Sequence, residues 1–423
     1  MGIQSAMYSG VSGLNTNSQA MSVIGNNLAN TNTLGFKGSR TVFSDLLSSS
    51  VFGSGGKSQV GRGVGLSTVD SIFSQGTFET TSSDTDVAIE GDGFFVLKEP
   101  GNDATYYSRA GAFRFDDEGY LINPEGFRVQ GKAFDVNGVM SAADPTDIQV
   151  ANVGLIEANP SSALTFTTNL NENSVQRGAG AIDPAVETSY NYTASSEIYD
   201  SLGESHLFTT YWRLIDDATN TWSMAYTTDG DPATITAIPG NLVFDTNGNL
   251  ADTNGDGTPD PQTFAITLPD WGNGSTAGLP MDLNFDCTQY DSASIVIGTN
   301  QNGYATGELT NVSIDGDGIV VASYSNGRKV NISQLVLAKF QNAGGLQLAG
   351  SNHYVATNDV GTIRVGLPGP ELGKVFTNSL EQSNVDMGQE FVKMITTQRG
   401  FQANSKIITT VDEMLSELIN LKR

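Results

Sequence analysis

The stretch IGNNLANTNTLGFK (Ile24–Lys37) holds four asparagines within seven residues and carries its only charge at the last position. No charged side chain precedes Lys37, although the whole chain has a formal net charge of −25. Asparagine tolerates the left-handed conformation and bonds to its own backbone, so the run predicts a helix that ends near Asn30 and a turn at Gly35. A direct contact between subunits is the alternative role, and the two are compatible. We expect Lys37 to begin a charged exterior.

Upstream of this stretch, apolar residues recur at a fixed interval. Met7, Leu14, Met21 and Leu28 are each seven residues apart. A seven-residue apolar repeat is typical of a helix that packs along a seam with another helix. The stripe is too narrow for a helix buried on all sides, so this segment needs a helical partner.

The same repeat returns near the other end of the chain. Met394, Phe401, Ile408 and Leu415 are also spaced by seven. The segment is the nearest candidate partner for the first stripe. We therefore predict that the two ends pair as coiled-coil helices and that these eight residues serve in self-assembly.

Between about Ser67 and Gly361 the pattern changes to short runs of Val, Ile, Phe, Tyr and Thr that are broken by Gly, Asn and Asp. Such runs indicate β-strands, and Asn326-Gly327 between two alternating segments is a strong hairpin signal. The predicted fold class is α+β and mostly β, with discontinuous nested β domains on a stalk formed by N- and C-terminal coiled-coil helices.

Nesting follows because both ends contribute to one helical domain, so each β domain is inserted within the last. The predicted division is a terminal helical coiled-coil domain (1–30 and 380–423), an extended connecting segment (31–70 and 361–379), an inner β domain (71–147 and 289–360) and an outer β domain (148–288).

Composition excludes several classes of function. The acidic excess falls in residues 71–373, and it disfavours nucleic acid and anionic membranes because like charges repel. One cysteine, Cys287, allows no internal disulfide, and we expect it to be buried as a small apolar residue. His206 and His353 are far apart and have no clustered partners in sequence, which argues against a zinc site or a histidine triad. We predict a chain that is not an enzyme, with no catalytic residue and no cofactor.

One segment is a weak candidate for a metal site. Asp252, Asn254, Asp256 and Asp260 alternate with Gly and Thr, and oxygen ligands at alternate positions suit calcium. The twelfth position is Thr263 instead of Glu, so an Asp/Asn/Gly turn is the favoured interpretation and no bound metal ion is predicted.

Both ends of the chain resemble the flagellar rod and hook protein family. Ser12-Gly13-Leu14 and Asn26–Lys37 are similar to the N-terminal signature, and Leu380–Phe391 with Gln398–Lys406 is similar to the C-terminal one. Ile89–Phe95 and Arg109–Phe113 resemble the shared β domain. The signature residues carried by this chain are Asn26, Asn27, Asn30, Thr33, Gly35, Phe36, Lys37, Asn384, Asp386, Gln398 and Arg399.

The middle of the chain favours the hook branch of this family. Asp200–His206 followed by Leu207–Arg213 resembles the start of the outer hook domain, which distal rod proteins lack. The resemblance implies a structural subunit of the bacterial flagellar hook that self-assembles into a curved hollow tube, a universal joint that transmits torque from rod to filament. It implies an extracellular location, reached through the flagellar type III export apparatus without a cleaved signal peptide or membrane insertion.

The partners implied are further copies of the chain, the distal rod, the hook cap and the hook–filament junction proteins. Some similar subunits link neighbours covalently through Cys and Lys, but no partner lysine for Cys287 is identified. The alternatives are a distal rod protein of the basal body and an extracellular calcium-dependent β-rich binding protein. The first leaves the middle segment as an insertion, and the second leaves both terminal repeats unexplained.

Overall fold

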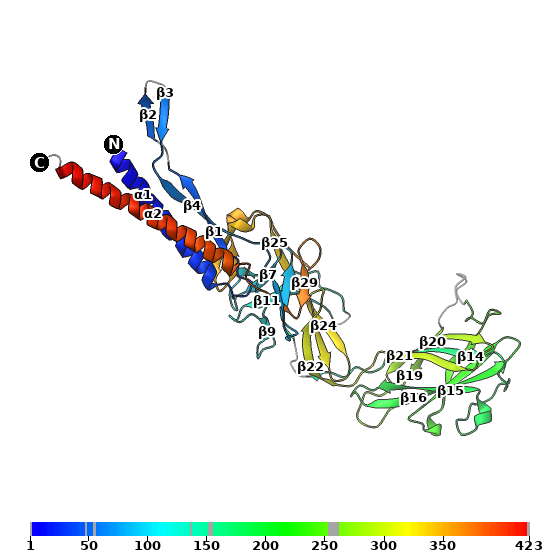
Figure 1. Cartoon of the computed structure of the whole chain (residues 1–423). Helices are drawn as coiled ribbons and strands as arrows, with labels where there is room; N and C mark the ends of the chain where they lie inside the picture. Colours follow the sequence, from blue (N-terminus) through cyan, green and yellow to red (C-terminus); the bar gives the residue numbers. More distant parts are fainter. Residues whose placement is uncertain are drawn as a thin grey trace. The chain divides into compact units, whose positions relative to one another are not determined.

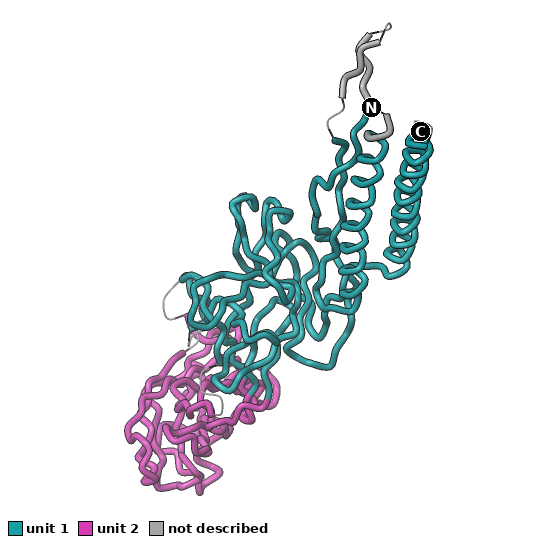
Figure 2. Tube along the Cα trace, turned by 90° about the vertical axis from the view of Figure 1, so that its left-hand side faces the viewer, with its two compact units in different colours: residues 1–153, 311–323, 329–423 teal, residues 154–310, 324–328 magenta. Residues whose placement is uncertain are grey.

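The computed structural model describes residues 2–46, 49–53, 56–135, 138–150, 155–252 and 262–420. The chain is mostly β, with two long helices, α1 (Gly2–Ala29) and α2 (Met387–Asn420), that pack together. This confirms the predicted fold class. Two compact units form, one from residues 1–153, 311–323 and 329–423, and one from residues 154–310 and 324–328 (Figure 2).

Helices α1 and α2 lie side by side and run in opposite directions (Figure 1). Gly10 faces Ile408, Gly13 faces Asn404, and Gly400 faces Asn17. A Cβ atom on Gly13 would lie 2.5 Å from Asn404 Nδ2, so a larger residue here would have to displace the Asn404 side chain. The α1 side of the seam is therefore built largely from small residues, which bring the two backbones close together.

The segment after α1 forms short antiparallel pairs. β1 (Ser39–Asp45) pairs with β4 (Val64–Ser71), and β2 (Ser49–Gly53) pairs with β3 (Gly56–Val60). The β4 strand is attached to α1, because Val64 N donates to Ser12 Oγ at 3.2 Å. The segment predicted as an extended connector thus forms strands beside the helix.

The strands of the first unit surround a doubly buried central strand, β7. Phe94 and Val96 of β7 face one apolar cluster, and Phe95 and Leu97 face the other, because successive side chains of a strand point to opposite faces. β7 pairs with β8, β11 and β25. The elements are β5 (Phe78–Thr80), β6 (Val87–Glu90), β7 (Phe94–Lys98), β8 (Thr105–Ser108), β9 (Arg114–Phe115), β10 (Leu121–Ile122), β11 (Arg128–Ala133), β12 (Thr146–Asp147), β23 (Ile319–Tyr324), β24 (Lys329–Leu335), β25 (Leu337–Phe340), η3 (Ala343–Gly345), β26 (Leu346–Gly350), β27 (His353–Ala356), η4 (Asn358–Val360), β28 (Ile363–Gly366), β29 (Lys374–Thr377) and β30 (Ser379–Glu381).

The second unit packs two four-stranded sheets on one core, in the orders β19-β20-β14-β21 and β15-β16-β17-β18. β20 alternates buried and exposed residues along its length, and its Phe285 meets Phe166 and Trp212 from other strands. The elements are β13 (Leu155–Ile156), β14 (Ala163–Asn171), η1 (Glu187–Ser189), β15 (Tyr192–Tyr199), β16 (Ser205–Asp216), β17 (Thr221–Thr228), η2 (Pro232–Thr234), β18 (Thr236–Val243), β19 (Gln262–Thr267), β20 (Pro280–Tyr290) and β21 (Ile295–Gln301); β22 (Gly307–Ile314) begins here and ends in the first unit.

The second unit covers a longer stretch than the predicted outer domain (148–288). Strand β21 forms an antiparallel pair with β14, so residues 295–301 belong to the same sheet as residues 163–171. The functional division of the chain into inner and outer domains stays a prediction. In the described helices, no segment is both long and apolar enough to cross a membrane.

Candidate functional site

The predicted junction lies where α1 ends and the chain enters the β strands of the first unit. Helix α1 ends at Ala29, and Asn30 holds the following turn: its Nδ2 donates to Asn26 O at 2.9 Å, and its Oδ1 accepts from Thr33 Oγ1 at 3.0 Å. The predicted helix end near Asn30 is confirmed. Three signature residues therefore have a local structural role.

Gly35 occupies a position that no other residue fits. Its φ is +65°, and an added Cβ would lie 2.6 Å from Ala110 N. Its own N–H donates to Glu381 O at 2.8 Å, which joins this turn to β30. The predicted turn at Gly35 is thus a point of close backbone contact between the two ends of the chain.

Lys37 does not begin the charged exterior, so that prediction was wrong. Its side chain is buried, and its Nζ lies 2.6 Å from Glu381 Oε1 and 2.7 Å from Ser74 O. Arg109 is buried beside them, with an N–O distance of 3.4 Å to Glu381 Oε2. Burial lowers the pKa of Lys37 and of Arg109, and the Glu381 carboxylate opposes both shifts. One carboxylate therefore joins two cations from distant parts of the sequence.

Two asparagines complete the connection. Asn27 Nδ2 donates to Ser39 O at 2.7 Å while its Oδ1 accepts from Ser39 N at 2.9 Å, so the side chain pairs with the backbone as a neighbouring strand does. Asn384 Oδ1 accepts from Gly38 N at 2.8 Å, and its Nδ2 donates to Ile72 O at 2.7 Å. Both amides fix the path on which the chain enters and leaves the helices.

Helix α2 begins with ordinary capping chemistry. The Asp386 carboxylate accepts from Gln389 N at 2.9 Å, which satisfies a free N–H of the first turn. Glu390 in that turn is buried and lies 3.3 Å from Asn27 Nδ2. The cap and this contact set the start of α2 against the end of α1.

The remaining predicted assembly residues lie along the two helices. Met7, Leu14, Met21 and Leu28 are partly buried on α1, beside the small-residue seam. Met394 and Ile408 are partly buried on α2, whereas Phe401 and Leu415 are exposed. Gln398 and Arg399 are exposed, and Phe36 is buried. The assembly role of these residues stays a prediction.

Sequence reasoning missed the partners at the junction. Glu381 stands 344 positions after Lys37, and no local pattern marks such a pair. Glu381 and Arg109 both lie in segments that resemble the flagellar family, and this resemblance is the sequence signal that could have marked them as junction residues. Residues with a long-range partner are found only when the fold brings them together.

The other predicted residues lie elsewhere. Cys287 is buried, as expected, and its Sγ lies 2.9 Å from Thr168 Oγ1; burial raises the pKa of its thiol to about 12. Asp252 is exposed, while Asn254, Asp256 and Asp260 lie outside the described residues, so the calcium loop stays a prediction. His206 has acidic neighbours, which corrects the expectation that it had none.

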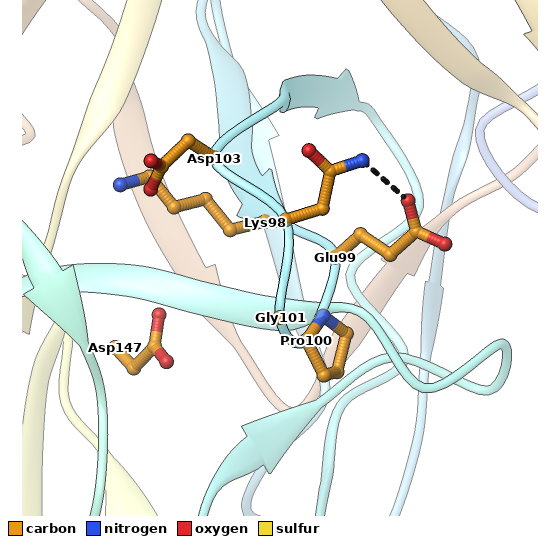
Figure 3. A pocket seen from close by; sticks show the side chains of 7 residues that line it. Lys98, Glu99, Pro100, Gly101, Asp103 and Asp147 are labelled. Atoms are coloured by element: carbon orange, nitrogen blue, oxygen red, sulfur yellow. Dashed lines mark hydrogen bonds between the residues drawn. The ribbon is translucent and has the colours of Figure 1, made fainter.

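A surface hollow of about 250 Å³ in the first unit is lined by polar groups of one loop and by Asp147 (Figure 3). Asn102 Nδ2 donates to Glu99 Oε2 at 3.1 Å, and Lys98 and Asp103 point toward one another in Figure 3.

Models of flagellar proteins match four parts of the chain. The flagella basal body rod protein model matches residues 7–37, and the flagellar hook protein FlgE/F/G D1 domain matches residues 88–158. The flagellar basal body protein FlaE D2 domain matches residues 169–304, and the flagellar basal body rod FlgEFG protein C-terminal model matches residues 377–421. A Borreliella burgdorferi relative named flagellar hook protein FlgE is 35% identical, with 99% of each chain covered.

The chain belongs to the flagellar hook protein family. Relatives of the same name from Treponema pallidum and Escherichia coli are 34% and 32% identical, and each match covers 99% of this chain. The crystal structure of Helicobacter pylori flagellar hook protein FlgE2 has a TM-score of 0.51 at 15% identity, over 72% of this chain and all of that one, which supports the fold. The family is structural. Its first and last models coincide with the two ends that meet at the junction.

Proposed function

We propose that this chain is the structural subunit of the bacterial flagellar hook and that it self-assembles through α1 and α2 into a curved hollow tube. The tube acts as a universal joint that transmits torque from the rod to the filament. The observation that carries the proposal is the apolar surface that α2 leaves uncovered. Among the α2 side chains that the structure describes, nine large apolar ones are exposed: Met387, Phe391, Val392, Ile395, Phe401, Ile407, Met414, Leu415 and Ile419.

Exposed apolar surface of this extent needs a cover, since each buried Val, Leu, Ile, Phe or Met side chain contributes roughly 1.5–3 kcal/mol. The seam with α1 already occupies one side of α2, so the exposed residues lie on sides that α1 does not reach. The cover that fits is the helix pair of neighbouring subunits. Met7, Leu14, Met21 and Leu28 on α1, with Met394, Phe401, Ile408 and Leu415 on α2, belong to this proposal.

The lack of charge on α1 supports assembly in many copies. Helix α1 has no charged residue in its first or last turn, and the chain has none before Lys37. A charge on a helix packed around a common axis would be repeated in every subunit and would repel its copies. An uncharged helix avoids that cost.

The proposal includes specific partners and a location. The subunit is exported through the flagellar type III apparatus, and it assembles outside the cell. The tube meets the distal rod at one end and the hook–filament junction proteins at the other, and the hook cap sits above it during growth. The match of residues 169–304 to a D2 domain favours the hook over a distal rod protein.

Electron microscopy of the purified chain tests the proposal. The full chain is expected to form curved tubes above a critical concentration, and a chain shortened to end at Asp386, before α2, is expected to stay monomeric. Straight rods, or a full chain that remains monomeric at every concentration, would contradict it.

A further inference from the structure

A cluster of acidic and imidazole groups lies in the second unit. Asp200 and Glu204 belong to the turn between β15 and β16, and His206 lies at the start of β16. One ligand atom from each of the three lies within 4.8 Å of the others. His206 is 8% exposed, and its Nε2 is buried without a hydrogen-bond partner in the described chain.

The other ring nitrogen of His206 fixes the state of the imidazole. Nδ1 lies 2.8 Å from Asp229 Oδ2 and donates to that carboxylate. Trp271 stacks on the ring at 3.7 Å between centroids. In the neutral ring Nε2 then carries a lone pair, and it points at Asp200 Oδ2, an acceptor 3.6 Å away. Two facing acceptors leave a place for a cation between them.

The charge of the cluster is not balanced by basic side chains. Among the described residues, His206 is the only basic side chain within 4.0 Å of the Asp200 or Asp229 carboxylate, and no lysine or arginine lies that close to the Glu204 carboxylate. Burial raises the pKa of Asp200, but hydrogen bonds from Asn273 and from the N–H groups of Glu204 and Leu202 outweigh it and hold the pKa at about 2.

Asn273 holds the two carboxylates together. Its Nδ2 donates to Asp200 Oδ2 and to Glu204 Oε2, both at 2.7 Å, and its Oδ1 accepts from Ser275 N at 2.9 Å. Ligand atoms bound to one ion at about 2.0–2.2 Å are at most about 4.4 Å apart. The ligand atoms of Asp200, Glu204 and His206 already lie within 4.8 Å of one another, which is close to that size.

We propose that Asp200, Glu204 and His206 form a binding site for a divalent cation of the Zn²⁺ class. An imidazole nitrogen with two carboxylates favours zinc and similar transition metals, whereas calcium and magnesium take oxygen ligands. Asp229 would orient the ligand, because its carboxylate accepts a hydrogen bond from His206 Nδ1, the ring nitrogen that does not bind the metal. A bound ion would hold the β15–β16 turn to the start of β16 and would neutralise the negative charge of the Asp200 and Glu204 carboxylates.

Isothermal titration of the full chain with ZnCl₂ tests the site. We expect one equivalent of zinc per chain and a rise in melting temperature, because the ion binds only the folded site. Glu204→Gln should weaken zinc binding at least tenfold, and since Glu204 is exposed this variant keeps the fold. Asp229→Asn should weaken binding by about 10- to 100-fold through the orientation of His206.

Glu197→Gln is the matched control, because it removes one exposed carboxylate from β15 of the same unit. It should leave zinc affinity unchanged. A native chain that binds no zinc would overturn the proposal, as would equal zinc affinity in the Glu204→Gln and Glu197→Gln variants, since that result would place the ion elsewhere on the acidic surface.

Discussion

At the scale of single residues, Glu381 is the centre of the junction. It accepts from Lys37, Arg109 and Gly76 N, the last at 2.9 Å, and its side chain is fully buried. Removing one member of a buried charge pair costs about 3–5 kcal/mol, because the remaining charges lose their partner without regaining water. We expect Glu381→Gln to destabilise the first unit by about that amount.

Urea unfolding can assign this loss to the first unit. All three tryptophans, Trp212, Trp222 and Trp271, belong to the second unit. The transition seen by circular dichroism but not by tryptophan fluorescence should move to lower urea, while the fluorescence transition stays in place. Glu371→Gln, which breaks an exposed ion pair with Arg364, should change stability by less than about 1 kcal/mol. Equal effects of the two variants would contradict the assigned role.

His353 gives the first unit a pH dependence. Its Nε2 lies 2.7 Å from Asn123 Nδ2, whose orientation is fixed because Asn123 Oδ1 accepts from Phe127 N. Burial lowers the pKa of His353 below 6.5, and nearby Glu125 opposes the shift. As the pH falls below 6.5, the unfolded chain takes up a proton that the folded ring does not, so stability decreases.

The expected slope is up to about 1.4 kcal/mol per pH unit between 6.5 and the pKa of the folded ring. His353→Gln retains an acceptor for Asn123 but does not titrate, so its unfolding free energy should fall less between pH 7 and pH 5. Urea unfolding of both proteins at each pH measures the difference. Identical slopes would show that His353 takes up its proton equally in the folded and unfolded chain, which would contradict the prediction.

Residue identities alone indicated part of the junction. Asn27, Gly35 and Lys37 stood out because they lie in a charge-free, asparagine-rich run, and the turn at Gly35 follows from its missing Cβ. The burial of Lys37 was not predictable, because its partner Glu381 comes from the far end of the sequence. The same reason hid the cluster around His206, whose partners Asp229 and Asn273 lie in other loops.

At the scale of elements, the seven-residue repeat indicated both helices and their pairing. The hairpin at Asn326-Gly327 is also confirmed, since β23 and β24 pair around it and Gly327 has a φ of +79°. The repeat did not reveal that Gly10 and Gly13 line the α1 seam. Glycine contributes no apolar signal, although it permits the closest backbone approach, so a count of apolar residues cannot find such a seam.

The exposed apolar residues of α2 predict a sharp loss of assembly on substitution. Ile395 is 49% exposed in the free chain. Ile395→Ser should leave the monomer as stable as before and raise the critical concentration for tube growth about 10- to 100-fold, because burial of this side chain is worth roughly 1.5–3 kcal/mol. Sedimentation of polymer from monomer measures the change.

Thr396→Ser is the control for that substitution. Thr396 is the next residue of α2, and its Oγ1 donates to Lys393 O at 2.8 Å, a bond that serine keeps. Its critical concentration should match that of the native chain. An unchanged critical concentration for Ile395→Ser would mean that no neighbour covers this face of α2.

At the scale of the whole molecule, the acidic excess of residues 71–373 opposes the packing of many copies. Salt screens exposed charges, with a Debye length of about 10 Å at 0.1 M and about 3 Å at 1 M. We expect the critical concentration for tube growth to fall as NaCl is raised, as light scattering would show. Ile395→Ser should raise the critical concentration at every NaCl concentration without changing how steeply it depends on salt. A critical concentration that rises with salt would contradict this prediction.

The junction also has a consequence for the order in which the molecule is completed. The seam joins residues near position 10 to residues near position 408, and Lys37 cannot pair with Glu381 until that distant part of the chain is present. During synthesis or export, the terminal helix that emerges first has no partner helix until the other end of the chain has emerged. Closure of the helix pair therefore requires both ends of the chain. Assembly is therefore limited to chains that carry both ends, because a chain that lacks either helix cannot form the surface that we propose its neighbours bind.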